Sequence, residues 1–187
     1  MTDKPERKFN LKEFRAITHA ISTYEEMRLL FQHLVEGLCR TFSIKGSSIM
    51  LYDESEKELF RVSSHGLSEE YLKKGSLHMN EEYEDFLKAK TVFYHDLSND
   101  PRVRYAESAA KEGIVSMISI PIKYKDAVVG LLKNYHNDQM SIHEDDLESI
   151  NILMQQLGVV IQLNGLKNFF EKMRSIMDNL PDHITEG

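Results

Sequence analysis

Two apolar segments joined by a short charged turn most constrain what this chain can fold into. Residues 113–122 are mostly hydrophobic, a second apolar run covers 128–132, and 123–126 between them is polar. This pattern predicts two antiparallel strands of a hairpin. Pro121 lacks a backbone N–H and predicts an edge or an end of the sheet at that point. Gly130 predicts a close approach by another backbone, a helix or a ligand.

Apolar periodicity predicts helices toward both ends of the chain. Hydrophobic residues recur at three- and four-residue spacing over 9–21, which is typical of an amphipathic helix. The Thr-x-x-Glu pattern at 23–26 has the form of a capping box and predicts a second helix from Tyr24. A Ser-x-x-Glu pattern at 141–144 predicts the start of a long last helix, which Pro181 stops.

Shorter segments between these helices predict the rest of a sheet. Residues 47–53 and 58–64 are expected to form a second hairpin, and 92–97 a further strand. Short helices are expected at 68–73 and at 103–111, the second of them after a run of turn-forming residues.

Four pieces of this pattern occur in order and in register. They are the hairpin at 47–66, the motif Asp-Leu-x-x-Asp-Pro-Arg at 96–102, the hairpin at 113–132 and Ser-Ile-His-Glu-Asp-Asp-Leu at 141–147. Together they resemble a GAF domain, a small-molecule sensing module, from about residue 23 to 163. The resemblance implies an α+β fold, in which an antiparallel sheet of five or six strands has long helices on one face and short helices and loops on the other.

The resemblance also suggests how the chain is divided. Residues 1–22 are expected to be an N-terminal linker helix, 23–163 the GAF domain, and 164–180 a signalling or coiled-coil helix. Residues 175–184 resemble the opening of a PAS domain. The segment 181–187 is therefore expected to be the start of a following domain, with a simple tail as the alternative.

Charge and composition argue against several classes of protein. The net charge of −7 does not suit a nucleic-acid surface, which needs a basic stripe. No apolar run approaches the roughly 18 residues of a membrane span, and the charged N-terminus is not followed by the apolar segment of a secretory signal. A cytoplasmic protein is expected, with no nucleic-acid partner and no membrane contact in this fragment.

Each chemistry known in the GAF family requires particular residues. Cyclic-nucleotide-binding members carry an Asn-Lys pair, then Phe, then Asp-Glu. Here Asn134 is followed by Tyr135, Met140 stands for the Phe, and Asp145-Asp146 stands for the last pair. Without the lysine the salt bridge to the acid cannot form, so the resemblance does not support cyclic-nucleotide binding.

Other family chemistries need cysteines that this chain lacks. Phytochrome-like members attach a bilin through a cysteine after the Asp-Pro-Arg turn, and 103–112 contains none. Methionine-sulfoxide reductases of the family need several cysteines, whereas Cys39 is the only one here. His95 and Asp96 are neighbours on a strand and point to opposite faces, so they cannot chelate one ion together. No enzyme activity, cofactor or metal is therefore expected.

Strand alternation separates the side of the sheet that would meet the long helices from the side that would meet the loops. Ile49 and Leu51 suit the helix side, which leaves Ser48, Met50 and Tyr52 on the loop side. For the strand at 92–96 the loop-side pair is Phe93 and His95, or else Tyr94 and Asp96, and for 116–120 the sequence leaves open which alternate set faces the loops. The candidate ligand-binding residues are Ser48, Met50, Tyr52, Phe93, His95, Ser116, Met117 and Ser119.

Two functions remain open from these residues. The first is a sensory domain that binds an unknown small molecule and transmits a signal through its terminal helices in a larger protein. The second is a ligand-free dimerisation module, in which the loops at 66–90 and 98–112 fill the space. In either case apolar stripes on the first and last helices predict a homodimer. The expected interface residues are Leu11, Phe14, Ile17, Ile21, Leu163, Leu166, Phe170, Met173, Met177 and Leu180.

Overall fold

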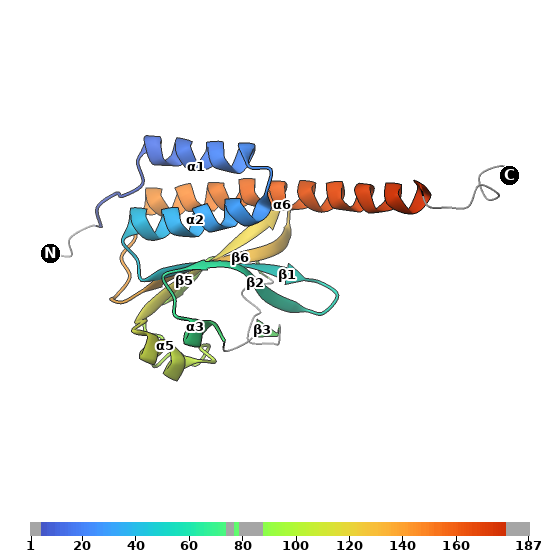
Figure 1. Ribbon diagram of the computed structural model, residues 1–187. Coiled ribbons are helices and arrows are strands. Elements are labelled where there is room, and N and C mark those ends of the chain that lie inside the picture. The colour runs from blue at the N-terminus through green and yellow to red at the C-terminus, as the bar shows by residue number, and fades with distance from the viewer. Residues whose placement is uncertain (1–4, 74–76, 79–87, 179–187) are drawn as a thin grey trace.

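The computed structural model describes residues 5–73, 77–78 and 88–178, and within them six strands form one antiparallel sheet in the order β3-β2-β1-β6-β5-β4. Helices α2 and α6 cover one face, α1 lies over them, and α3 and α5 lie on the opposite face (Figure 1). The expected α+β architecture is confirmed. The strands are β1 (Gly46–Asp53), β2 (Glu58–His65), β3 (Leu77–His78), β4 (Val92–Tyr94), β5 (Ser116–Tyr124) and β6 (Ala127–His136). The helices are α1 (Leu11–Thr23), α2 (Met27–Phe42), α3 (Glu69–Leu72), α5 (Ala106–Glu112) and α6 (Glu144–Asp178).

The hairpin that the apolar segments predicted is the pair β5 and β6, at the centre of the sheet. Pro121 lies in β5 opposite Leu131, and β4 pairs with β5 only over Met117–Ser119. Within the described residues, β5 therefore has no neighbouring strand beside Pro121 on its β4 side. A residue without a backbone N–H is tolerated there because no ladder hydrogen bond is required of it. The prediction of a local edge is confirmed.

Two glycines mark places where backbones come too close for a side chain. A Cβ atom on Gly130 would lie 2.3 Å from the carbonyl oxygen of Met50 in β1, which confirms the predicted close approach. A Cβ atom on Gly158 of α6 would lie 1.9 Å from the carbonyl oxygen of Lys123 in β5. The long helix therefore rests directly on the backbone of the central hairpin.

The helix side of the sheet holds the main hydrophobic core. Side chains of β1, β5 and β6 meet those of α2 and α6, and Phe9 and Ile21 extend the core toward α1. Burial of this kind contributes about 1.5–3 kcal/mol for each large side chain removed from water. The fully buried members include Leu30, Leu38, Ile49, Ile118, Ile120, Ile122, Leu132 and Ile150.

Helix α2 begins later than the capping-box pattern at 23–26 predicted. Thr23 is the last residue of α1, and its hydroxyl donates to the carbonyl oxygen of His19 at 2.7 Å. That bond back into the preceding turn takes the hydroxyl away from any role as an N-cap. The N-cap of α2 is Glu26, which makes no side-chain capping bond. The predicted start at Tyr24 is therefore wrong by three residues.

The start of α6 also differs from the predicted capping box at 141–144. Nδ1 of His143 accepts a hydrogen bond from the backbone N–H of Asp145 at 3.1 Å, and the His143 carbonyl accepts from Leu147 at 3.0 Å. The imidazole of His143 therefore takes the place that Ser141 was expected to fill, because it lies next to the first turn of the helix.

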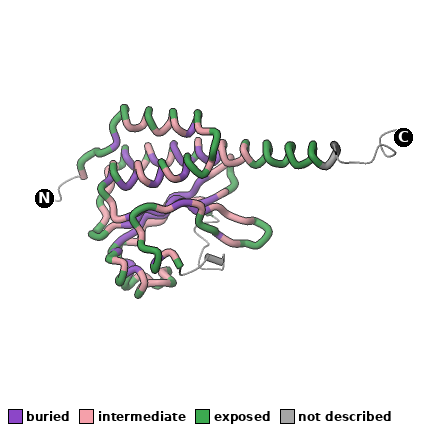
Figure 2. The backbone as a smooth tube through the Cα atoms, viewed as in Figure 1, coloured by how far each residue is buried: buried purple, intermediate pink, exposed green. Residues whose placement is uncertain are grey.

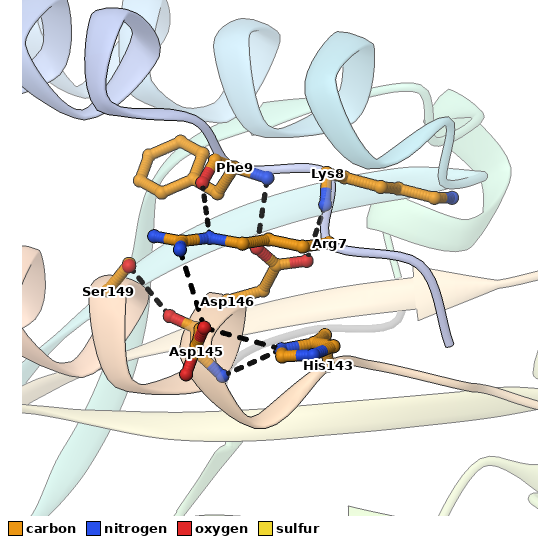
Figure 3. A network of polar contacts seen from close by, with 7 residues as sticks. All are labelled: Arg7, Lys8, Phe9, His143, Asp145, Asp146 and Ser149. Atoms are coloured by element: carbon orange, nitrogen blue, oxygen red, sulfur yellow. Dashed lines mark hydrogen bonds and ion pairs between the residues drawn. The ribbon is translucent and has the colours of Figure 1, made fainter. Parts of the chain in front are cut away.

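Residues 7–9 form a short segment, the N-terminal strap, that ties α1 to the start of α6 (Figure 3). The Asp146 carboxylate accepts from the backbone N–H groups of Lys8 and Phe9, each at 2.9 Å. Phe9 is buried between Phe14 and Phe42, with ring centroids 6.0 and 5.8 Å away. The strap is followed by Asn10, which caps α1 through a capping box with Glu13.

The distal half of α6 runs past the rest of the domain and is exposed (Figures 1 and 2). None of the helices in the described part of the chain is long and apolar enough to cross a bilayer. Of the predicted interface residues, the side chain of Met177 and all of Leu180 lie outside the described residues, as does the segment 181–187 with its resemblance to a PAS domain.

The prediction that the first helix offers an apolar stripe to a partner is wrong for most of that stripe. Ile21 is 3% exposed, and it lies in the helix-side core of its own chain. Phe14 and Ile17 pack against the same core. Only Leu11 points outward, with 79% of its surface exposed. Helix α1 uses its apolar face on α6 and α2 of the same molecule, so this face is already covered.

Candidate ligand-binding cavity

The loop side of the sheet carries its own side chains, in the alternation predicted for β1. Met50 and Tyr52 pack on this side with Leu59 and Leu131, whereas Ile49 lies in the helix-side core. Neighbouring residues of a strand point to opposite faces, so the two cores share one sheet. Helices α3 and α5 cover this face, on the side of the sheet opposite α2 and α6 (Figure 1).

A cavity of about 70 Å³ lies between this face and the elements that cover it. This loop-side cavity is bordered by strands β1, β2, β5 and β6, by α3, and by the segment 94–105. Its lining residues are Ser48, Met50, Arg61, Leu67, Tyr71, Leu72, Tyr94, Leu97, Arg102, Val103, Arg104, Tyr105, Met117, Lys133 and Tyr135.

The floor of the cavity holds a buried hydroxyl pair. The Ser48 hydroxyl and the Tyr135 hydroxyl are hydrogen-bonded at 3.2 Å, and both residues are buried. The Tyr135 ring meets Tyr71 of α3 edge to face, with centroids 5.9 Å apart. Burial raises the pKa of Tyr135 above its ordinary value, so the hydroxyl stays protonated and can donate a hydrogen bond.

Lys133 of β6 is a buried amine in the same floor. It is 7% exposed, and burial lowers its pKa from 10.5 to about 8. A charged ammonium in a desolvated position is stabilised by acceptors and negative groups close to it.

Arginines form part of the wall. The Arg61 guanidinium donates to the carbonyl oxygen of Leu72 at 3.1 Å and so holds the end of α3 against β2. Arg102 binds the Asp100 carboxylate through two nitrogens, at 2.9 and 2.6 Å, and lies 4.6 Å over the ring of Tyr94. The hydrogen bond from Arg102 lowers the pKa of Asp100. The Asp-Pro-Arg motif is therefore a turn stabilised by an ion pair between its own first and last residues, and its arginine borders the cavity.

Three of the predicted residues line this cavity, namely Ser48, Met50 and Met117. Of the two alternatives left open for β4, the structure places Tyr94 at the cavity, while Phe93 packs against the helix-side core. The prediction for Phe93 is wrong because β4 pairs with β5 in the register that turns Phe93 toward the helices and Tyr94 toward the loops.

His95 and Ser116 also lie away from the cavity. The ring of His95 stacks on that of Phe93, with centroids 6.1 Å apart, outside the cavity lining. The Ser116 hydroxyl donates to the carbonyl oxygen of Asp138 at 2.7 Å and accepts from the N–H of Met140 at 3.0 Å. Both predictions are therefore wrong. The His95 ring lies against Phe93, outside the cavity, and the Ser116 hydroxyl stabilises the loop after β6.

Tyr52 and Ser119 were predicted at the cavity but do not border it. Tyr52 belongs to the adjoining apolar cluster with Met50 and Leu131, near the turn of its hairpin. Ser119 is buried opposite Lys133 in the β5–β6 ladder. Lying on the correct face is therefore not sufficient, because the cavity covers only part of that face.

The cationic lining was missed from the sequence. In β6, Lys133 and Tyr135 alternate with Leu132 and Asn134, which face the helices. This alternation in the sequence could have placed Lys133 and Tyr135 on the loop side. Arg61 could not be assigned to this face from the sequence. The β1–β2 pairing is irregular between Ile49 and Met50, and this irregularity shifts the inward and outward alternation of side chains in the hairpin.

Cys39 lies on α2, away from this cavity. It is buried, and burial raises its pKa to about 11. A thiol with this pKa is a weak nucleophile at neutral pH. Over the described ranges, no group of three or more His, Cys, Asp or Glu side chains is arranged to hold a metal ion.

Comparison with known families identifies a match to most of the chain. Residues 25–162 match the family model described as GAF domain. No curated protein matches the sequence at a significant level.

Solved structures show the same fold at low sequence identity. The GAF domain of a phosphoenolpyruvate-protein phosphotransferase from Coxiella burnetii has a TM-score of 0.75 at 18% identity, covering 84% of this chain and 95% of that one. The GAF domain of the Acinetobacter phosphoenolpyruvate-protein phosphotransferase has a TM-score of 0.71 at 20% identity, covering 83% and 94%. The phycocyanobilin-bound GAF domain of a cyanobacterial phytochrome has a TM-score of 0.67 at 18% identity, covering 83% and 95%.

Proposed function

Because the chain belongs to the GAF domain family, we propose that it is a sensory domain that binds a small organic molecule in the loop-side cavity. It transmits the binding event through α6 to other parts of a larger signalling protein. The observation that supports this most directly is the cavity itself, because a hollow lined by aromatic, apolar and a few polar groups is typical of small-molecule sites.

The lining suggests the charge of the ligand. Arg61, Arg104 and Lys133 contribute cationic groups, whereas the charge of Arg102 is balanced by Asp100, and among the described lining residues none is acidic. Tyr135 and Ser48 add hydroxyls at the floor. We propose a small organic anion, with its charge toward these cations and its body against the tyrosine rings.

The domain is proposed to act by binding and not by catalysis. Its one cysteine is buried with a raised pKa, which does not suit a thiol nucleophile. The Ser48 and Tyr135 hydroxyls at the cavity floor are hydrogen-bonded to each other, and the proposal assigns them to ligand binding.

A second function is a ligand-free dimerisation module. The size of the cavity favours this alternative, since about 70 Å³ is small beside the pockets of drug-sized ligands, which are about 300–1,000 Å³. Tyr71, Leu97 and Met117 already pack together at its side. The two functions differ in whether any molecule enters the cavity.

Both functions include a dimer formed through the distal part of α6. Leu163, Leu166, Phe170 and Met173 are 65%, 52%, 66% and 42% exposed, on a helix that extends beyond the domain. Their three- and four-residue spacing forms one stripe, which is typical of a coiled-coil seam. A contiguous apolar stripe of this kind is stabilised by a partner, and a second copy offers a matching one.

Binding of small carboxylates tests the sensory function. Acetate, pyruvate and benzoate are titrated by calorimetry into the chain, with acetamide and benzamide as neutral controls. At least one carboxylate is expected to bind, and Arg104→Glu is expected to weaken that binding about tenfold or more, since it reverses a charge at the cavity. Lys111→Glu, on the exposed surface of α5, is the matched control and is expected to have no effect.

The outcomes separate the two functions. Binding of the amides alone would contradict the proposed charge of the ligand and leave the sensory function standing. If none of these probes binds, and the protein purified from cells releases no small molecule on denaturation, the dimerisation module is the better account.

A further inference from the structure

A second cavity, of about 260 Å³, lies on the other side of the sheet, beneath the N-terminal strap. It is bordered by the strap, by the end of α2 at Phe42, by the ends of β5 and β6, and by the first turn of α6. Figure 3 shows three of its lining residues, Lys8, His143 and Asp146, around the strap. It shares no lining residue with the loop-side cavity.

One buried polar residue that lines this strap cavity is Asn134 of β6. Asn134 is 3% exposed, and its Oδ1 accepts a hydrogen bond from the Ser47 hydroxyl at 2.8 Å. Its amide nitrogen makes no hydrogen bond to any described residue, although it lies among the residues that line the cavity. A ligand that offers an oxygen at this point could accept a hydrogen bond from the amide nitrogen.

Charged groups of both signs lie around the mouth of the cavity. The Lys8 ammonium donates to the carbonyl oxygen of Phe42 at 3.0 Å, which leaves two of its protons for other acceptors. The exposed carboxylates of Glu6 and Asp138 border the same space, and in the described chain neither has a hydrogen bond or an ion pair.

These groups narrow the chemistry of the ligand. A simple anion would meet Glu6, Asp138 and the buried carboxylate of Asp146. A simple cation would meet Lys8 and would leave the amide nitrogen of Asn134 without an acceptor. A small zwitterion satisfies both sets, with its carboxylate on Asn134 and Lys8 and its ammonium on the acids.

We propose that the strap cavity is a second small-molecule site, which binds a free amino acid through Asn134, Lys8 and Asp138. The half-buried His136 adds a neutral hydrogen-bonding group, since burial lowers its pKa. Because the strap and the start of α6 both contribute to the walls, an occupant would bridge them to the end of β6.

Calorimetric titration with each proteinogenic amino acid tests this site. The amino acid that binds most tightly is then compared with its own amide, which lacks the carboxylate, and with its N-acetyl derivative, which lacks the ammonium. Both derivatives are expected to bind at least tenfold more weakly. Asp138→Asn and Lys8→Met are expected to weaken the parent amino acid about tenfold each, while Asp126→Asn, at the opposite end of the β5–β6 hairpin, leaves it unchanged.

Three results would overturn the proposal. One is that no amino acid binds with a dissociation constant below about 10 mM. Another is that the amide and the N-acetyl derivative bind as tightly as the parent. The third is that an amino acid binds but responds to Arg104→Glu and not to Asp138→Asn or Lys8→Met, which would place it in the loop-side cavity and support the sensory function instead.

Discussion

The backbone N–H of Phe9 donates to the buried carboxylate of Asp146 at 2.9 Å, across 137 residues of sequence. Asp146 is 1% exposed, and its second oxygen accepts from the N–H of Lys8. A carboxylate that receives two backbone donors at a helix start is well stabilised, because the helix dipole also favours negative charge there. This pair fixes the N-terminal strap to α6.

Replacing Asp146 with asparagine should destabilise the domain by about 1–3 kcal/mol, since one backbone N–H would then face an amide donor and lose its acceptor. Urea denaturation followed by circular dichroism measures the change. Asp145→Asn is the matched control: that residue pairs with Arg7 on the exposed surface, and its loss should cost less than about 1 kcal/mol. Equal losses from the two variants would contradict the role assigned to Asp146.

Alanine at two glycines of α6 should have opposite effects. Gly158→Ala places a Cβ atom 1.9 Å from the Lys123 carbonyl oxygen and must push the helix off the sheet, so a loss of at least about 2 kcal/mol is expected. Gly165→Ala meets nothing within 4 Å and should stabilise the helix by about 0.5–1 kcal/mol. Thermal melting of both variants measures the difference, and a stable Gly158→Ala protein would show that α6 is not seated as described.

The buried Lys133 predicts a rise in stability at alkaline pH. Its pKa of about 8 in the folded chain lies below the ordinary 10.5, so the unfolded chain binds the proton more tightly between these values. Lys133 should therefore add about 2 kcal/mol to the free energy of unfolding from pH 8 to pH 10. Cys39 offsets about 1 kcal/mol of this gain, because burial raises the pKa of its thiol to about 11 and the thiol ionises at lower pH in the unfolded chain. A net rise of about 1 kcal/mol is expected. The scan ends at pH 10 because burial also raises the pKa of Tyr135, whose ionisation on unfolding lowers the stability at higher pH.

The Lys133→Met variant should lack this rise, while Lys111→Met on the exposed surface should keep it. Urea midpoints at each pH provide the measurement. A Lys133→Met protein with the same pH dependence as the wild type would assign the effect to another group.

Cys39 should be nearly unreactive in the folded domain. With its pKa raised to about 11, on the order of 0.1% of the thiol is ionised at pH 8. Reaction with Ellman's reagent should therefore be slow in native protein and complete within minutes in urea. Fast labelling of the native protein would contradict the buried position.

Charges on the α6 stripe should prevent the proposed dimer. Leu166→Glu with Met173→Glu places two carboxylates on the exposed apolar seam, and the chain should then be monomeric by light scattering at about 50 µM. The control, Asn168→Glu with Ser175→Glu, adds the same charge to the opposite side of the helix and should remain dimeric. A monomeric wild type, or a dimer indifferent to the first pair, would refute the seam.

The sheet and the long helices were predictable because each depends on local periodicity. The β5–β6 hairpin and the alternation of Ile49 and Met50 follow from side-chain spacing, which the fold preserves. The helix starts were less predictable. Thr23 and His143 show why, since a hydroxyl or an imidazole has several nearby backbone partners, and tertiary packing selects among them.

The candidate site was only partly predictable for a related reason. The phase of β4 depends on where a three-residue strand joins β5, and no turn motif specifies that register, so Phe93 and Tyr94 were interchangeable in the sequence. The apolar stripe of α1 was assigned to a partner because spacing reveals an amphipathic face but not its neighbour. In the fold, Ile21 meets α6 and α2 of its own chain.

Helix α6 is a single rod of 35 residues that rests on β5 at Gly158 and continues to Asp178. The part beyond that contact is about 30 Å long at 1.5 Å per residue. Small rotations about the contact with the Lys123 carbonyl are therefore amplified along the helix. A tilt of about 5° at this contact would displace the far end of α6 by about 3 Å. Packed side chains do not absorb a displacement of that size. In the proposed dimer, a change too small to disturb the core would therefore still alter how the two α6 helices pack.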